Sequence, residues 1–409
     1  MTAAGTTATP RRRLAALRAA WLFDGTSPTL MANPTVVIDG DTIIMVGQSV
    51  PVPEGATVVD LAGATILPGL VDSHVHLAFD SSADPVARLA ERDDAAAFAA
   101  MASTARAAAR GGVTTVRDLG DRGYLSLGLR EAARTDPSLP EILAAGPPIT
   151  TPGGHCHYLG EPAVGRAGIR AAIRERADRG VDVIKIMASG GNLTPGSRPE
   201  LAQYGLEELR AAVEEAHGLQ LPITAHAHGT QAIADALAAG VDGLEHVSFM
   251  TADGVDEISE ELLVALASNP VTLGMTLGIA PAPGAAPPPG MIARMPAMIA
   301  NAQRMYRAGA SMIAGTDAGI SPIKPPDVLR WAFAHLQQLG MTPAEALHSC
   351  TARAAAACGL GNRKGRLMSG YDADMLVIDG NPLDDPAALH QIRAVYVRGV
   401  ALSGPDGGH

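Results

Sequence analysis

Residues 222–249 read PITAHAHGTQAIADALAAGVDGLEHVSF, and this stretch decides the fold class. A short apolar run that ends in two histidines is followed by an Ala-rich run, Thr230–Ala239, and then by a second apolar run with another histidine. In a strand–helix–strand unit the two strands pair in parallel, because the helix returns the chain to the edge of the sheet at which the first strand began. We therefore expect an α/β protein with a parallel sheet.

The same alternation continues in both directions along the chain. Further strand-like runs occupy residues 69–77, 112–118, 141–149, 181–189, 271–276 and 311–317. Helical stretches that separate them include Asp93–Arg110, Gly168–Arg179, Leu206–His217 and Met291–Ala308. Eight such units over about 290 residues favour a (β/α)8 TIM barrel at residues 68–365. A doubly wound sheet is the alternative, but the sequence lacks the glycine fingerprint of that fold.

The two ends of the chain have a different pattern. Residues 14–67 and 366–409 contain short apolar runs separated by Asp-Gly, Gly-Asp or Ala-Gly, which is typical of hairpins. Because chain termini often lie close together, we expect both ends to form one small β-sandwich domain. Residues 1–13 are predicted to be a disordered arm, since Arg18 and Asp24 interrupt the apolar segment that a signal peptide would need.

Composition limits the partners and the location. A net charge of −11 over 409 residues argues against nucleic acid or an anionic membrane as the main partner. Only three cysteines are present, which excludes a disulfide scaffold and suits a reducing cytoplasm. The uncharged stretch 262–293 carries six prolines, so it is predicted to be a strand followed by a Pro-rich loop rather than a membrane helix.

Residues that could bind a metal lie at or near the C-terminal ends of five predicted strands. They are His74, His76, Lys185, His226, His228, His246 and Asp317. In a barrel the carboxyl ends of the strands form the mouth of the active site. Residues i and i+2 share one face of a strand, so His74 and His76 can hold one cation, whereas spacing cannot choose between His226 and His228. Imidazole and carboxylate ligands suit Zn²⁺, with Mn²⁺, Fe²⁺ or Co²⁺ as alternatives.

The segments PGLVDSHVHL, VDVIKIMASGG, ITAHAHG, GLEHVSF and AGTDAG, in this order, resemble the amidohydrolase superfamily. GGVTTVRDLG and KGRLMSGYDADMLVIDGNPL extend the resemblance to roughly residues 15–400. GGHCHY and KIMASGG are similar to the prolidase-like, zinc-dependent dipeptidase and carboxypeptidase group. The implied centre holds two divalent ions, most simply Zn²⁺. The ligands that the resemblance implies are His74, His76 and Asp317 for the more buried ion, His226 and His246 for the second, and a carbamate on Lys185 for both.

The resemblance also implies a reaction. A hydroxide that bridges the metals would attack the amide carbonyl of a dipeptide or N-acyl amino acid, because metal binding lowers the pKa of water towards about 7. Asp317 would shuttle the proton to the leaving nitrogen. An apolar strand lowers the pKa of Lys185, which makes the neutral amine available for carbamylation. Relatives often carry Tyr where His228 stands, so the resemblance does not assign a role to this histidine. Three roles stay open: it polarises the carbonyl, binds a carboxylate or supports the site.

Other polar residues are candidates for substrate binding. They are His155, His157, Tyr158, Arg198, Gln203, Tyr204 and His228. Arg198 is the expected partner of a substrate carboxylate. Cys156 is not expected to be the nucleophile, because the metals supply one. Arg117 and Asp118 are predicted to form a supporting ion pair, and Gly278–Gly290 is either a lid or a surface loop.

Several other functions compete with the peptidase. A ring-opening hydrolase of a lactam, cyclic amide or carbamate would need no cation for a free carboxylate, so the direction of Arg198 discriminates between the two. An amide-processing enzyme of specialised metabolism is a further alternative. A deaminase is disfavoured because that branch does not use a strand-four lysine, and a non-catalytic scaffold is disfavoured because every ligand position is filled. The resemblance implies a homo-oligomer that acts on a small molecule.

Overall fold

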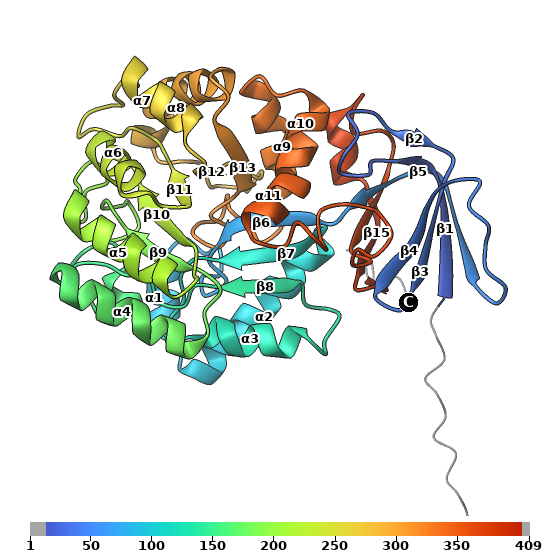
Figure 1. The fold of residues 1–409 in the computed structure, drawn as a ribbon, viewed down its shortest axis with the longest axis horizontal. Coiled ribbons are helices and arrows are strands. Elements are labelled where there is room, and N and C mark those ends of the chain that lie inside the picture. Colours follow the sequence, from blue (N-terminus) through green and yellow to red (C-terminus); the bar gives the residue numbers. More distant parts are fainter. Residues whose placement is uncertain (1–13, 403–409) are drawn as a thin grey trace, which may run out of the picture.

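The computed structural model describes residues 14–402, so the arm predicted at residues 1–13 lies outside the described residues. The chain has a mixed α/β fold in which helices lie around a set of parallel strands, with a mostly antiparallel sheet beside them (Figure 1). In the part of the chain that the structure describes, none of the helices combines the length and the apolar character needed to cross a membrane.

The parallel strands form two sheets. One contains β6 (Leu70–Val75), β7 (Val113–Asp118) and β8 (Glu141–Ala144). The other has the order β13 (Ser311–Gly315), β12 (Thr272–Thr276), β11 (Gly243–His246), β10 (Ile223–Ala227) and β9 (Ile184–Met187). Isolated parallel bridges join Val75 to Ala318 and Ile149 to Ile186, so each edge of one sheet has a contact with the other. A strand is therefore present in each of the eight predicted runs.

The helices follow these strands along the chain. Their bounds are α1 (Pro85–Ala90), α2 (Asp94–Arg110), α3 (Leu125–Ala133), α4 (Gly165–Arg179), α5 (Leu206–Gly218), α6 (Thr230–Ala239), α7 (Glu260–Ser268), α8 (Pro289–Arg307), α9 (Leu329–Gln338), α10 (Pro343–Cys350) and α11 (Ala352–Ala357). The interpretation of residues 262–293 was wrong at its start, because α7 covers Leu262. The Ser259 side chain caps this helix by accepting a hydrogen bond from the Leu262 amide.

Strands from both ends of the chain share one eight-stranded sheet. It contains β1 (Leu14–Leu22), β2 (Met31–Ala32), β3 (Pro34–Asp39), β4 (Thr42–Gln48), β5 (Thr57–Pro68), β14 (Met375–Asp379), β15 (Ile392–Val397) and β16 (Val400–Leu402). The two ends meet where β14 pairs antiparallel with β5, with Val377 opposite Ile66. Both side chains are buried, so apolar packing supports the pairing. The boundaries of the sandwich domain and of the barrel stay predictions.

Candidate metal centre

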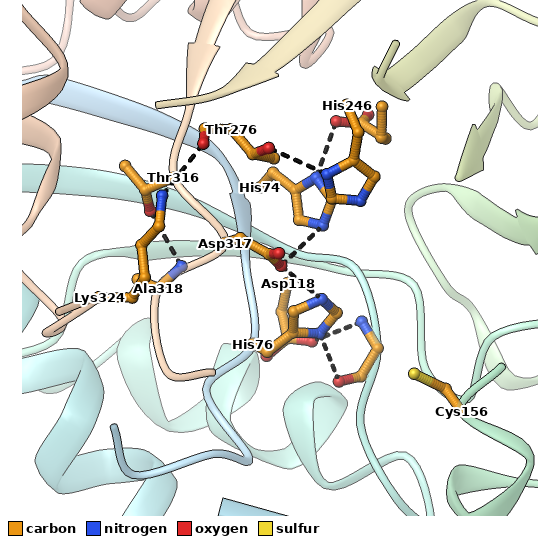
Figure 2. A network of polar contacts seen from close by, with 12 residues as sticks. His74, His76, Asp118, Cys156, His246, Thr276, Thr316, Asp317, Ala318 and Lys324 are labelled. Atoms are coloured by element: carbon orange, nitrogen blue, oxygen red, sulfur yellow. Dashed lines mark hydrogen bonds and ion pairs between the residues drawn. The ribbon is translucent and has the colours of Figure 1, made fainter. Parts of the chain in front are cut away.

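His74, His76 and Asp317 form the first cluster, at the carboxyl ends of β6 and β13. Oδ1 of Asp317 lies 3.4 Å from Nε2 of His74 and 3.2 Å from Nε2 of His76. Figure 2 shows the carboxylate between the two rings. The Asp317 amide donates to the carbonyl of His74 at 2.8 Å, which ties the two strand ends together. Asp317 has a φ of 63°, in the left-handed region where non-glycine residues are uncommon and often functional.

His226, His228 and His246 form the second cluster, at the ends of β10 and β11. One nitrogen of each ring lies within 4.8 Å of the others, and all three residues are buried. The centroid of the His246 ring lies 4.6 Å from that of His226 and 4.5 Å from that of His228. The ring of His74 lies 5.1 Å from the ring of His246, so the two clusters are neighbours.

Hydrogen bonds assign the free nitrogen of each ring in the second cluster. Nε2 of His226 lies 2.9 Å from the carbonyl oxygen of Gly190. A carbonyl only accepts, so Nε2 carries the proton and Nδ1 is the nitrogen able to bind a metal. Nδ1 of His246 forms a hydrogen bond with Thr276 Oγ1 at 2.9 Å, which leaves Nε2 of this ring free to bind a metal. Nδ1 of His228 likewise bonds the Ser248 hydroxyl at 2.7 Å.

Lys185 on β9 is a buried amine without a counter-ion at hydrogen-bond distance. The residue is 1% exposed, and among the described residues its Nζ has no hydrogen-bond partner. Burial lowers its pKa to about 8, so a neutral, nucleophilic amine is accessible. An orphaned amine beside two donor clusters fits a carbamate ligand shared by two divalent cations.

Burial keeps the imidazoles in the neutral form that binds metals. It lowers the pKa of His74 and of His228 to about 4, and it holds the pKa of His226 and of His246 well below the usual range. Metal ligation requires such deprotonated nitrogens, so the cluster is prepared for cations at neutral pH.

Asp317 is held ionised despite its burial. Burial opposes ionisation, but the hydrogen bond from His76 and the nearby His74 hold the pKa of the Asp317 carboxyl far below its usual range. For His76 burial also opposes the charged form, yet the hydrogen bond and charge of Asp317 raise its pKa. The first cluster therefore combines two imidazoles with a carboxylate, a donor set that suits Zn²⁺.

A buried carboxylate that the sequence analysis missed supports the first cluster. Oε2 of Glu245 lies 2.9 Å from Nδ1 of His74, and Oε1 accepts a hydrogen bond from Arg117 at 3.0 Å. The predicted ion pair of Arg117 with Asp118 is wrong, because adjacent strand residues face opposite sides. Asp118 instead accepts backbone amide protons from Leu77 and, two residues along its own loop, Gly120.

His155 is a candidate substrate residue that lies beside the second cluster. It is buried, and its ring centroid lies 4.6 Å from that of His226. Its backbone amide donates to Gln203 Oε1 at 2.6 Å, while the Gln203 amide group donates to Thr150 Oγ1 and to the Met187 carbonyl. Gln203 therefore fastens the loop of His155 to β9, and its predicted contact with substrate stays a prediction.

The neighbouring histidine and tyrosine lie on the same loop but in a more open position. His157 is exposed, and its Nδ1 bonds the Gly154 carbonyl at 2.9 Å. The half-buried Tyr158 directs its hydroxyl to Sγ of Cys156 at 3.8 Å. Burial raises the pKa of the Cys156 thiol to about 12. The thiol therefore stays protonated at neutral pH and is a poor nucleophile.

The last two candidates make contacts outside the clusters. The Arg198 side chain is 59% exposed and forms an ion pair with Glu200 at 2.5 Å. Tyr204 is buried in the core, where its hydroxyl donates to the Ala163 carbonyl at 2.9 Å. The buried hydroxyl is thus satisfied by the scaffold, and a role for either residue in substrate binding stays a prediction.

Comparison with known families agrees with this arrangement. The model of the Amidohydrolase family matches residues 65–402, a range that includes both clusters and Lys185. The chain belongs to the amidohydrolase family. As an amidohydrolase, it is a hydrolase that acts on carbon–nitrogen bonds.

Several known proteins are similar to this chain over most of their length. Ochratoxinase of Aspergillus niger is 28% identical over 405 residues, which covers 89% of this chain and 81% of the relative. An uncharacterized protein of Mycobacterium tuberculosis is 30% identical over 363 residues, covering 85% and 88%. The crystal structure of a Xaa-Pro dipeptidase with bound methionine in the active site has a TM-score of 0.83 and 26% identity, covering 96% of this chain and all of the other. The predicted resemblance to the superfamily is confirmed.

Proposed function

We propose that this amidohydrolase cleaves the amide bond of a dipeptide or N-acyl amino acid at a centre of two divalent cations in a (β/α)8 barrel. The observation that carries the proposal is the juxtaposition of two metal-donor clusters, one of them with the ionised carboxylate of Asp317, with the buried amine of Lys185, which has no hydrogen-bond partner among the described residues. Zinc is the cation that the imidazole and carboxylate donors suit best. The isolated bridges at both sheet edges support the closed barrel.

Each side chain has a role that follows from its position. His74, His76 and Asp317 would hold one cation, His226 and His246 the other, and carbamylated Lys185 both. Two bound cations would supply Lewis acidity and an acidified water. Asp317, ionised at neutral pH, would take the proton of that water on its carboxylate and release it to the leaving nitrogen. His228, with Nδ1 accepting from the Ser248 hydroxyl, would donate a hydrogen bond from Nε2 to the carbonyl oxygen.

The ring-opening hydrolase remains as a second candidate because of one observation. Arg198, the predicted partner of a substrate carboxylate, is already paired with Glu200 on the exposed loop. Opening a lactam, cyclic amide or carbamate does not require a free carboxylate in the substrate, so this reaction does not need Arg198 in the site. An amide substrate of specialised metabolism likewise does not require a carboxylate that Arg198 would bind. The names of the relatives, an ochratoxinase and a Xaa-Pro dipeptidase, support amide cleavage in general.

Amine release from a panel of dipeptides, N-acyl amino acids and lactams tests the proposal. The protein is loaded with zinc in bicarbonate buffer, and Asp317→Asn is the control. Turnover of linear amides with a free carboxylate supports the peptidase. Ring opening alone supports the second candidate. If protein with two bound metals hydrolyses none of these substrates, the result would contradict both the peptidase and the ring-opening hydrolase for the substrates in the panel. The cytoplasmic location and the homo-oligomer stay predictions.

A further inference from the structure

A buried ion pair joins the two parallel sheets directly beneath the first cluster. Arg117 extends from β7 and Glu245 from β11, and their side chains meet at 3.0 Å while both residues are nearly inaccessible to solvent. A buried pair of this kind contributes little net stability, since the desolvation of both charges offsets their attraction. Its presence in the interior therefore calls for another role.

Every oxygen of the Glu245 carboxylate is engaged. Oε1 accepts from Arg117 and, at 2.7 Å, from the Thr224 hydroxyl, while Oε2 faces Nδ1 of His74 at 2.9 Å. The Arg117 Nε also donates to the carbonyl of Ser73 at 2.7 Å. The same guanidinium therefore holds the backbone just before His74 and the carboxylate that holds its ring.

Strand β12 leaves room for this carboxylate at Gly274. A Cβ atom built on Gly274 would lie 2.0 Å from Oε2 of Glu245 and 2.8 Å from its carboxyl carbon. Any side chain here would push the carboxylate away from His74. Strands β6, β7, β10 and β12 thus surround the Glu245 carboxylate of β11, and this carboxylate contacts the first cluster through His74.

We propose that Glu245 is a positioning residue that sets the affinity of the His74–His76–Asp317 cluster for its cation. By accepting the proton on Nδ1, the carboxylate fixes the tautomer and the direction of the His74 ring, so that Nε2 presents its lone pair beside Asp317. Arg117 and Thr224 hold the carboxylate in place. The inference rests on the proposed function only in requiring that this cluster binds a divalent cation.

Zinc affinity and zinc stoichiometry, measured without substrate, test the inference. Competition with a chromophoric chelator is followed for the full chain and for Glu245→Gln and Gly274→Ala. Both variants should bind one of the two zinc ions about 10- to 100-fold more weakly, the usual effect of losing the partner of a metal-bound histidine. Gly274→Ala keeps the charge of Glu245 and changes only the position of its carboxylate. Glu245→Gln and Gly274→Ala should therefore both weaken zinc binding because both disturb the contact between this carboxylate and His74.

Two control variants separate positioning from stability. Asp374→Asn breaks another buried ion pair, with Lys364, and should lower the melting temperature without changing zinc affinity. Gly218→Ala adds a methyl group to open space at the end of α5; it should leave zinc affinity unchanged and raise the melting temperature slightly, because alanine favours the helix. Unchanged zinc affinity in folded Glu245→Gln and Gly274→Ala would overturn the inference, as would equal losses in Asp374→Asn.

The outcome also separates this inference from the proposed function. Protein that binds two zinc ions but hydrolyses no amide refutes the proposed function alone, and the affinities of the variants still decide the role of Glu245. Unaltered protein that takes up no divalent cation refutes both.

Discussion

The ring nitrogen Nε2 of His226 lies 2.9 Å from the carbonyl oxygen of Gly190. This contact gives the ring a defined direction, with the proton on Nε2 and the lone pair of Nδ1 turned to the cluster. His228 has its Nδ1 on the Ser248 hydroxyl, which can donate or accept and so fixes its tautomer less strictly. The two histidines, which sequence spacing could not separate, therefore differ in how they are held.

His226→Ala should lower the metal content of the purified protein from the proposed two ions per chain to about one, because the variant lacks a proposed ligand of the second cluster. His228→Ala should keep both ions and lose kcat, because its proposed role is to polarise the substrate carbonyl. Atomic emission spectroscopy of dialysed protein measures the metals, and amine release measures kcat. If His228→Ala loses the ion and His226→Ala keeps it, the assignment is reversed.

Metal-free Lys185→Met should be more stable than the metal-free parent at pH 7. The folded-state pKa of Lys185 is lowered from 10.5 to about 8 by burial, so between these values the unfolded chain holds a proton that the folded chain has released. Stability therefore rises with pH through this window. Below it the cost of the buried charge is about 3 kcal/mol, at 1.36 kcal/mol per pKa unit. Methionine removes that cost, and its advantage should shrink towards pH 10.

Urea unfolding in chelator and CO₂-depleted buffer at pH 7 and pH 9.5 measures this difference. Lys364→Met is the matched control, since this buried lysine is paired with Asp374 and Asp372, and its replacement should destabilise the protein at both pH values. A Lys185→Met variant that is less stable than the parent at pH 7 would mean that the amine has a partner in the metal-free protein.

Gln203→Ala should lower kcat/KM roughly 10- to 100-fold, because a loop that is misplaced by about 1 Å costs that much in catalysis. The side chain accepts from the His155 amide and donates to Thr150 and Met187, so its loss also leaves buried polar groups unpaired, at about 1–3 kcal/mol. Gln231→Ala, on the surface of α6, is the control and should change neither quantity. Unchanged kinetics in Gln203→Ala would show that the loop of His155 does not contact the substrate.

The positions of the strands and of the clusters could be predicted because buried parallel strands are continuous apolar runs. A polar residue inside such a run is conspicuous, as Lys185 is in VDVIKIMAS. Glu245 carries the same signal in GLEHVSF, next to His246, although it is not one of the expected metal ligands. An acidic residue in a buried strand needs a partner, and this rule would have found it.

Contacts between strands that are distant in the sequence could not be predicted in the same way. The Arg117–Glu245 pair depends on which strands face each other across the interior, and no local pattern encodes this. Loop residues are harder still, since the charge of Arg198 gave no indication that Glu200, two residues away, would bind it. Tyr204 follows β9 in the sequence, which predicts a place near the site, but the residue is buried and its hydroxyl donates to the Ala163 carbonyl instead.

Asp317→Asn should preserve the fold while kcat falls by about 100- to 10,000-fold, the usual contribution of general acid–base catalysis. The backbone of residue 317 has a φ of 63°, and asparagine tolerates this left-handed conformation as well as aspartate does. The amide has nearly the same shape as the carboxylate, so the melting temperature and circular dichroism should stay close to those of the parent. An amide cannot take a proton from water, and this property alone removes the proposed shuttle.

The metal content of Asp317→Asn decides how the loss is interpreted, because Asp317 is also a predicted ligand. Two bound ions with a collapsed kcat would locate the defect in proton transfer, whereas loss of one ion would locate it in the cluster with His74 and His76. Asp80→Asn is a suitable control, since Asp80 pairs with Arg92 and should leave both kcat and metal content unchanged. Retained kcat with two ions bound in Asp317→Asn would remove this residue as the proton shuttle.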